Sequence, residues 1–144
     1  MYQMNKTCVC LGGYNVFINF DLKLKVQKAI LQSIKAGYGI FLCNGFGNWS
    51  LFLASILREI QLNGYDILIE CYIPCIFNAE QYKKELYALS YFDEVYILPG
   101  KNLLETDLFL IKKGQRIIMP KDEKIKNQTI IETISRLAKE VIII

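Results

Sequence analysis

The chain has 144 residues, no histidine and a formal net charge of +3, and 53% of its residues are hydrophobic. This length suits one domain with a sizeable core, spanning residues 1–144. The absence of histidine removes the commonest general base at neutral pH and the commonest metal ligand. Triad hydrolases and zinc hydrolases are therefore not expected, and we predict no metal site and no resident cofactor.

The composition also bears on compartment and partners. No apolar run approaches the roughly 20 residues that a membrane-spanning helix needs, and the first ten residues lack the charged-then-apolar order of a signal peptide. Five cysteines without CxxC spacing argue against a disulfide scaffold and favour small buried thiols. The lysines are spread thinly, unlike those of a nucleic-acid-binding face. We expect a cytoplasmic protein that binds no membrane and, on this charge pattern, no nucleic acid.

Short apolar segments alternate with amphipathic ones along the chain. Strands are predicted at 7–11, 40–43, 66–73, 94–98, 116–119 and 141–144. Helices are predicted at 22–36, 49–62, 104–113 and 127–139, with a further helix starting near residue 78. Almost wholly apolar strands separated by helices indicate a mostly parallel sheet of about six strands, covered on both faces. The predicted fold class is α/β, a three-layer α/β/α Rossmann-like sandwich.

Glycine, asparagine and proline gather where the predicted strands end. In a parallel sheet these ends meet at one edge, where ligands bind in open α/β folds. The loop Gly45-Phe46-Gly47-Asn48 leads from the second strand into the unpaired amides and positive dipole end of a helix. Glycines let an anionic group come close to those amides. The sequence therefore predicts a nucleotide-like or other anionic small-molecule ligand.

The residues expected to bind this ligand come from three strand ends and one helix. They are Gly12, Gly13, Tyr14, Asn44, Gly45, Phe46, Gly47, Asn48, Lys84, Pro99, Gly100, Lys101 and Asn102. The glycines and asparagines would form a backbone cradle, and the two lysines would add positive charge. An aromatic ring such as Phe46 or Trp49 could stack on a base, although each fits a core or subunit-interface position equally well.

The order of these segments resembles the SLOG superfamily, named for the DNA-processing protein DprA (also called Smf) and the LOG cytokinin-activating enzymes. Within it, the chain is most similar to the YpsA-like bacterial proteins. Three motifs of those proteins have matching segments here. Residues 6–15 match a strand that ends in TGHRP, and residues 43–48 match a strand end with the motif SGxAxGxD. Residues 74–82 match the motif PCPxQxxxW at the end of the third strand. The His-Arg pair and the aspartate of those motifs have no counterparts. The resemblance covers nearly the whole chain and implies a Rossmann-like fold and a homodimer.

The second half also resembles the LOG enzymes, whose fourth strand ends LPGGxGTxxE. The matching run here is LPGKNLLETD, residues 98–107, in which Asp107 takes the place of the acid. The resemblance implies that this turn holds a nucleotide phosphate and that the acid helps to cleave the base from the ribose. Lys101 and two leucines replace two glycines and a threonine. An arginine of the preceding LOG helix falls near Lys84, which lacks the bidentate fork.

Catalysis would need an acid near the ribose and a held water, and the candidates are Asp107, Glu105 and Glu80. Each also suits the first turn of a helix, where acids favour the dipole. With no histidine and an altered glycine motif, a non-catalytic sensor or regulator is the favoured hypothesis. A LOG-like nucleoside monophosphate phosphoribohydrolase is the first alternative, and a DprA-like single-stranded DNA-binding protein is the second.

A dinucleotide-binding domain is a further possibility. Gly45-x-Gly47-x-x-Ser50 loosely matches the glycine fingerprint, and Glu70 lies about 25 residues on, where an acid would bind ribose hydroxyls. This hypothesis is weaker because the loop follows the second strand rather than the first. Glu70 is also followed by three more strand-like residues, which places it inside the strand.

Overall fold

The computed structural model describes residues 6–12, 18–44, 47–74, 90–98, 101–121 and 128–144. Its strands are β1 (Lys6–Cys10), β2 (Tyr38–Cys43), β3 (Leu68–Pro74), β4 (Glu94–Leu98), β5 (Arg116–Met119) and β6 (Glu140–Ile143). Its helices are α1 (Phe20–Lys35), α2 (Gly47–Leu62), α4 (Leu103–Lys113) and α6 (Gln128–Arg136). The predicted alternation of strands and helices is confirmed for these segments. The helix predicted near residue 78 lies outside the described residues.

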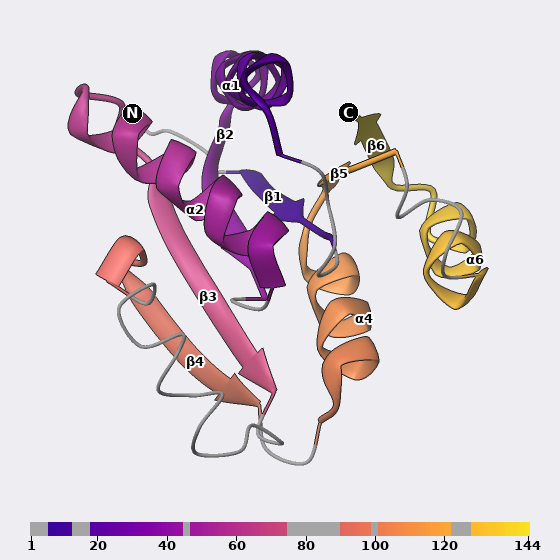
Figure 1. Ribbon diagram of the computed structural model, residues 1–144. Coiled ribbons are helices and arrows are strands. Elements are labelled where there is room, and N and C mark those ends of the chain that lie inside the picture. Colours follow the sequence, from indigo (N-terminus) through magenta and orange to yellow (C-terminus); the bar gives the residue numbers. More distant parts are fainter. Residues whose placement is uncertain (1–5, 13–17, 45–46, 75–89, 99–100, 122–127) are drawn as a thin grey trace.

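The six strands form one sheet in the order β4-β3-β2-β1-β5-β6, and every neighbouring pair is parallel (Figure 1). The register places Cys10 of β1 beside Cys43 of β2, and Cys43 beside Cys71 of β3. Parallel sheets need both faces covered, which agrees with the nearly continuous apolar sequence of β1, β2 and β5. The predicted Rossmann-like α/β class is therefore confirmed.

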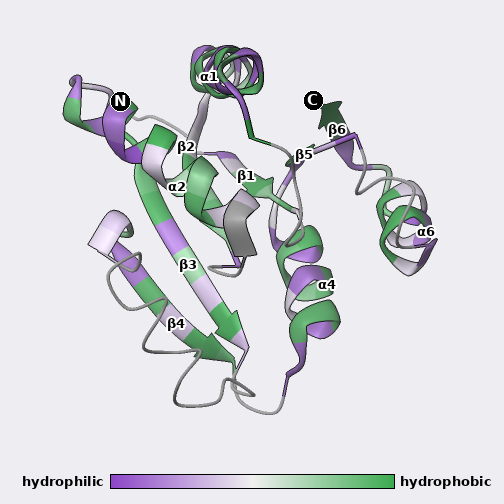
Figure 2. Ribbon diagram, viewed as in Figure 1, coloured by the Kyte–Doolittle hydropathy of each residue, from purple (hydrophilic) through white to green (hydrophobic). Residues whose placement is uncertain are grey.

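Helices cover both faces of the sheet. On one face, α1 and α2 contribute side chains such as Ile30 and Leu57 to a core that includes Phe41 of β2. On the other face, α4 and α6 contribute Leu110 and Ile134 to a second core. In Figure 2 hydrophobic and hydrophilic residues alternate along the ribbon of each helix, as expected for a helix with one buried side. The result is the predicted three-layer sandwich.

The ends of the helices follow from local sequence. The side chain of Asn19 accepts a hydrogen bond from the backbone N–H of Leu22 at 2.8 Å and caps α1. Gly37 ends that helix with φ +99°, a conformation that glycine adopts without steric cost. The last helix ends at Arg136, three residues before the predicted end at 139, because Ala138 turns into the left-handed region with φ +53°.

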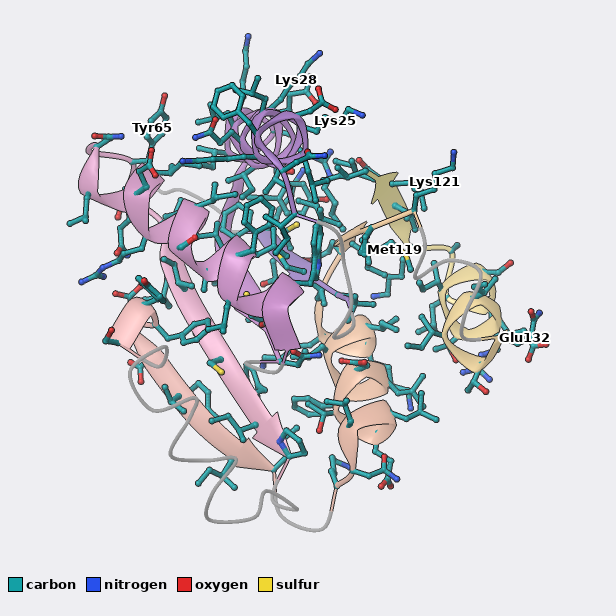
Figure 3. The ribbon with its side chains drawn as sticks, in the orientation of Figure 1. Lys25, Lys28, Tyr65, Met119, Lys121 and Glu132 are labelled. Atoms are coloured by element: carbon teal, nitrogen blue, oxygen red, sulfur yellow. The ribbon has the colours of Figure 1, made fainter. Side chains whose placement is uncertain are left out.

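The chain reverses its direction across the sheet between β1 and β5. The connection after β1 leads to α1 on one face, whereas the connection after β5 leads to α6 on the opposite face. Ligands of open α/β sheets bind beyond the carboxyl ends of the strands at such a reversal. Gly12, Asn44 and Lys121 follow β1, β2 and β5 at this edge (Figure 3 labels Lys121). We refer to it as the carboxyl edge.

Candidate functional site

A buried polar pair lies at the carboxyl edge. Nδ2 of Asn44 donates a hydrogen bond to Oδ1 of Asp107 at 2.9 Å. The two side chains are 1% and 8% exposed. Asn44 follows β2 directly, two residues after Leu42, whose side chain packs in the α4 core, so the amide projects toward the same face. The structure thus brings together a predicted ligand-binding residue and a predicted catalytic candidate that are 63 positions apart.

This pair has a defined chemical character. An ionised carboxylate only accepts hydrogen bonds, and it has about four acceptor positions. The amide of Asn44 fills one of them and fixes the orientation of the group. A carboxylate in this setting suits the hydroxyl or amino groups of a ligand, and it repels a phosphate.

Trp49 occupies the space above the end of β1. Its side chain is fully buried. A Cβ atom added to Gly12 would lie 1.8 Å from Cδ1 of the indole, so the ring rests directly on the glycine backbone. Of the two roles predicted for Trp49, the structure shows core packing. Packing against the indole also explains why a glycine stands at position 12, while a ligand-binding role for Gly12 stays a prediction.

The N-terminus of α2 keeps the electrostatic character that the sequence predicts. The helix begins at Gly47, so Gly47 and Asn48 lie in its first turn, together with Trp49 and Ser50. No acidic residue is present in that turn. The partial positive charge of the helix end is therefore not offset by a carboxylate of its own first turn. This end of α2 suits an anionic group.

The N-terminus of α4 is different because the chain caps it. The side chain of Asn102 accepts from the backbone N–H of Glu105 at 2.8 Å, and the carboxylate of Glu105 accepts from the backbone N–H of Asn102 at 3.0 Å. This reciprocal capping box satisfies two helix-end donors. Glu105 therefore caps the N-terminus of α4, which is the alternative to catalysis that the sequence left open for it. Lys101, half-buried, directly precedes the cap.

Glu70 lies inside β3, four residues before the strand ends at Pro74. The hydroxyl of Tyr72 donates to its carboxylate at 3.0 Å. Burial, and then the neighbouring Glu70 carboxylate, raise the pKa of Tyr72 well above its usual range. Because Glu70 is within the strand and already bonded to Tyr72, it does not stand where a dinucleotide-binding acid would.

The cysteines behave as apolar side chains. Cys8, Cys10, Cys43 and Cys71 are free and buried, as predicted. The hydrogen bond to Cys10 and then burial raise the pKa of Cys43 well above its usual range, so its thiol stays protonated.

Among the described residues, no group of three or more histidine, cysteine or acidic side chains could hold a metal ion. Within the same ranges, no helix has the length and hydropathy to cross a membrane.

Several predicted site residues lie outside the described residues. They are Gly13, Tyr14, Gly45, Phe46, Glu80, Lys84, Pro99 and Gly100.

Two residues at the carboxyl edge were not among those predicted from the sequence: Pro120 and Lys121, which follow β5. The sequence held a signal for them, since a proline and a lysine directly follow the predicted fifth strand. Without the strand order, however, nothing indicated that β5 lies beside β1.

Comparison with known proteins supports the fold. No protein-family model matches the chain, and no curated protein matches it. The X-ray structure of TM1055, a target of the Northeast Structural Genomics Consortium, superposes with a TM-score of 0.60 at 14% sequence identity. The alignment covers 94% of this chain and 72% of TM1055. At this identity the likeness extends to the fold alone: the chain shares the Rossmann-like α/β architecture of TM1055.

Proposed function

We propose that this protein binds a nucleotide or nucleotide-derived small molecule at the carboxyl edge and acts as a non-catalytic sensor or regulator. The observation that carries the proposal is the buried Asn44–Asp107 pair at that edge. Burying a carboxylate is costly unless its acceptor positions are filled. Polar groups placed together at the reversal point of an open α/β sheet are typical of a ligand site.

Charge divides the proposed site in two. The first turn of α2, with no acid, is suited to the phosphate. Asp107, which lies across the sheet edge in α4, is suited to ribose hydroxyls or a base amino group. A ligand with an anionic group at one end and hydroxyl groups at the other fits this arrangement. Nucleoside monophosphates and ADP-ribose derivatives have both features.

Two observations favour binding without turnover. The turn before α4, which in LOG enzymes would hold a phosphate, is closed by the Asn102–Glu105 capping box. Glu105 also brings negative charge to that helix end. In addition, Asp107 accepts a hydrogen bond from Asn44, which fixes the orientation of its carboxylate. A binding protein needs neither an open phosphate turn nor a general base.

The LOG-like phosphoribohydrolase is kept as the second candidate because Asp107 stands buried at the carboxyl edge. Incubation with AMP, followed by chromatography for free adenine, tests it directly. Release of adenine by the native protein, abolished in Asp107→Asn, would replace the sensor proposal with the enzyme. Absence of release while AMP still binds would support the sensor.

The proposal also includes membership of the SLOG superfamily, a homodimer in solution and a cytoplasmic location. Sedimentation equilibrium measures the oligomeric state.

The DprA-like alternative receives little support from the surface charge, because the labelled lysines are scattered. Lys25 and Lys28 point outward from α1, whereas Lys121 lies beyond β5 (Figure 3). Lys25 is moreover paired with Asp21 at 3.2 Å. Salt-sensitive binding to single-stranded DNA would reverse this judgement.

A thermal-shift screen tests the main proposal. A ligand that binds only the folded state stabilises it by RT ln(1 + [L]/Kd), about 2.7 kcal/mol at a hundredfold excess over Kd. AMP, cyclic nucleotides and ADP-ribose are the probes, and Asp107→Ala is the matched variant. We expect a rise in Tm for the native protein that is reduced in the variant. If none of these compounds at millimolar concentration raises the Tm, the proposal is wrong.

A further inference from the structure

The sheet is only partly covered at β4, on the side where α4 lies. From β1 to β4 the strand order runs in one direction, and right-handed connections in that direction cross the face that α1 and α2 cover. The connections that run back toward β6 cross the opposite face, through α4 and α6 (Figure 1). On that face α4 packs against β1 and β3. The edge strand β4 therefore lies beyond α4, at the margin of the sheet.

The exposed residues on this side of β4 are aromatic and acidic. Tyr96 stacks on Tyr72 of β3 with ring centroids 4.9 Å apart, so it faces the same side as the α4 core to which Tyr72 belongs. It is nevertheless 40% exposed. Glu94 and Glu70 stand two residues before these tyrosines and so face the same side, and the register places them next to each other. We call Glu70, Glu94 and Tyr96 the β4 patch.

The negative charge of the β4 patch is not balanced by an ion pair. Among the described residues, no lysine or arginine forms an ion pair with Glu70 or Glu94. Lys113 of α4 lies instead over the ring of Tyr72, 5.9 Å from its centroid. Partial burial, and then the carboxylates of Glu94 and Glu70, raise the pKa of Tyr96. The β4 patch therefore suits a partner surface that is both apolar and positively charged.

The outer side of α4 has this complementary character. Five side chains, at helical spacings of three and four residues, line a hollow of about 260 Å³: Lys101, Glu105, Leu108, Phe109 and Lys112. Leu108 and Phe109 are half-buried and provide its apolar part. Lys112 is exposed in the last turn of the helix. An aromatic ring suits the apolar part of the hollow, and a carboxylate suits the end at Lys112.

We propose that two copies of the chain form a dimer in which the outer side of α4 of each copy packs on the β4 patch of the other. The two-fold axis lies parallel to the strands. This inference rests on the homodimer of the proposed function and assigns its surface. The contact is isologous, so the helix of each copy covers the margin that the other copy leaves open. Tyr96 enters the hollow of the partner helix, and Glu94 pairs with the partner's Lys112.

Contacts within one chain fix the levels of these groups along the strands. Phe109 contacts Tyr72, with ring centroids 5.6 Å apart, and Tyr72 is in register with Tyr96. Toward the amino end of the strands, Glu94 lies two strand residues further, about 7 Å. Lys112 lies three helical residues further in the same direction, about 4.5 Å. A two-fold axis parallel to the strands preserves these levels, whereas a perpendicular axis would carry Lys112 away from the carboxylates.

Charge exchange tests this surface. Lys112→Glu and Glu94→Lys each bring like charges together at both contacts of the dimer, and sedimentation equilibrium gives the dissociation constant. We expect each variant alone to dimerise about a hundredfold more weakly than the native protein. An equimolar mixture of the two should form a heterodimer as tight as the native dimer, because opposite charges then meet at both contacts. Lys28→Glu changes an outward lysine of α1 (Figure 3) and should dimerise as the native protein does.

The substituted side chains are exposed, so the variants should fold, which far-UV circular dichroism checks. If one does not, Lys112→Gln and Glu94→Gln take their place, with dimerisation about tenfold weaker for each. Native protein that stays monomeric at millimolar concentration would overturn the surface and the homodimer together, while the rise in Tm with AMP tests ligand binding independently. Dimers of unchanged strength in both variants would leave the homodimer and refute the surface. Weakened variants that fail to combine on mixing would refute the pairing of Lys112 with Glu94.

Discussion

The carboxamide of Asn44 donates a hydrogen bond to the carboxylate of Asp107 at 2.9 Å. This bond connects the end of β2 to α4, the helix that follows β4 in the chain. The two residues lie 63 positions apart. A short polar contact of this kind fixes both the helix and the strand end relative to the carboxyl edge. It also leaves the carboxylate oriented before any ligand arrives, which lowers the entropic cost of binding.

Removing the amide donor should therefore destabilise the protein. In Asn44→Ala the Asp107 carboxylate loses a buried hydrogen bond, and we expect a loss of about 2 kcal/mol in the free energy of unfolding. Urea denaturation measures it. Asp107→Asn retains an oxygen that can accept from Asn44, so it should cost less. A double-mutant cycle of Asn44→Ala with Asp107→Ala isolates the pair; additive costs would mean that the two side chains do not interact.

Gly12→Ala should damage the packing at the end of β1. The new Cβ would lie 1.8 Å from Cδ1 of Trp49, far inside van der Waals contact, so the indole or the strand has to move. Overpacking of a buried site costs about 1–3 kcal/mol, which urea denaturation can measure. In a Trp49→Ala background the ring is gone and the same Gly12→Ala change should cost much less. Equal costs in both backgrounds would show that the indole does not cause the effect.

Asn102→Ala tests whether the α4 turn serves the helix or a ligand. Loss of the cap should reduce the free energy of unfolding by about 1 kcal/mol, because the N–H of Glu105 loses its acceptor. Glu105→Gln preserves the geometry of the capping box and should cost less. We expect both variants to bind AMP as tightly as the native protein. A loss of AMP affinity larger than the loss of stability explains would assign Asn102 to the ligand.

The fold could be predicted because its signals are local and repeated. Apolar runs such as Ile40–Cys43 predict buried parallel strands, and glycines such as Gly37 and Gly64 mark helix ends with φ near +100° in the structure. The last helix was predicted too long because alanine carries no signal for the left-handed turn at Ala138. The high helix propensity of alanine favours a helix that continues through Ala138. The chain must turn there to enter β6, and this tertiary requirement outweighs the propensity.

The candidate site could be predicted only in part, because strand order and packing decide which loops meet. Asn44 and Asp107 were both selected from sequence, yet their hydrogen bond depends on the path of α4 across the sheet. Glu105 was a catalytic candidate as well as a helix-end residue, and only the structure shows it in the capping box. Trp49 was ambiguous because an indole serves a core and a ligand equally well. Its contact with Gly12 joins residues from two crossovers, and no spacing in the sequence shows it.

Tyr72 should make the stability of the protein fall in alkali. Burial and then the Glu70 carboxylate raise its folded-state pKa above the unfolded value of about 10. A raised pKa means that the folded state holds the proton more tightly, so this contribution is fully present below about pH 10 and is lost as the pH rises further. Tyr72→Phe has no phenol proton, so its stability should fall less steeply between about pH 9 and pH 11.

Lysines and other tyrosines titrate in both proteins and cancel in the comparison. Glu70→Gln should show an intermediate slope, because it removes the negative neighbour but not the burial. Urea denaturation across this range gives the three slopes, and parallel curves for the native protein and Tyr72→Phe would refute the assignment.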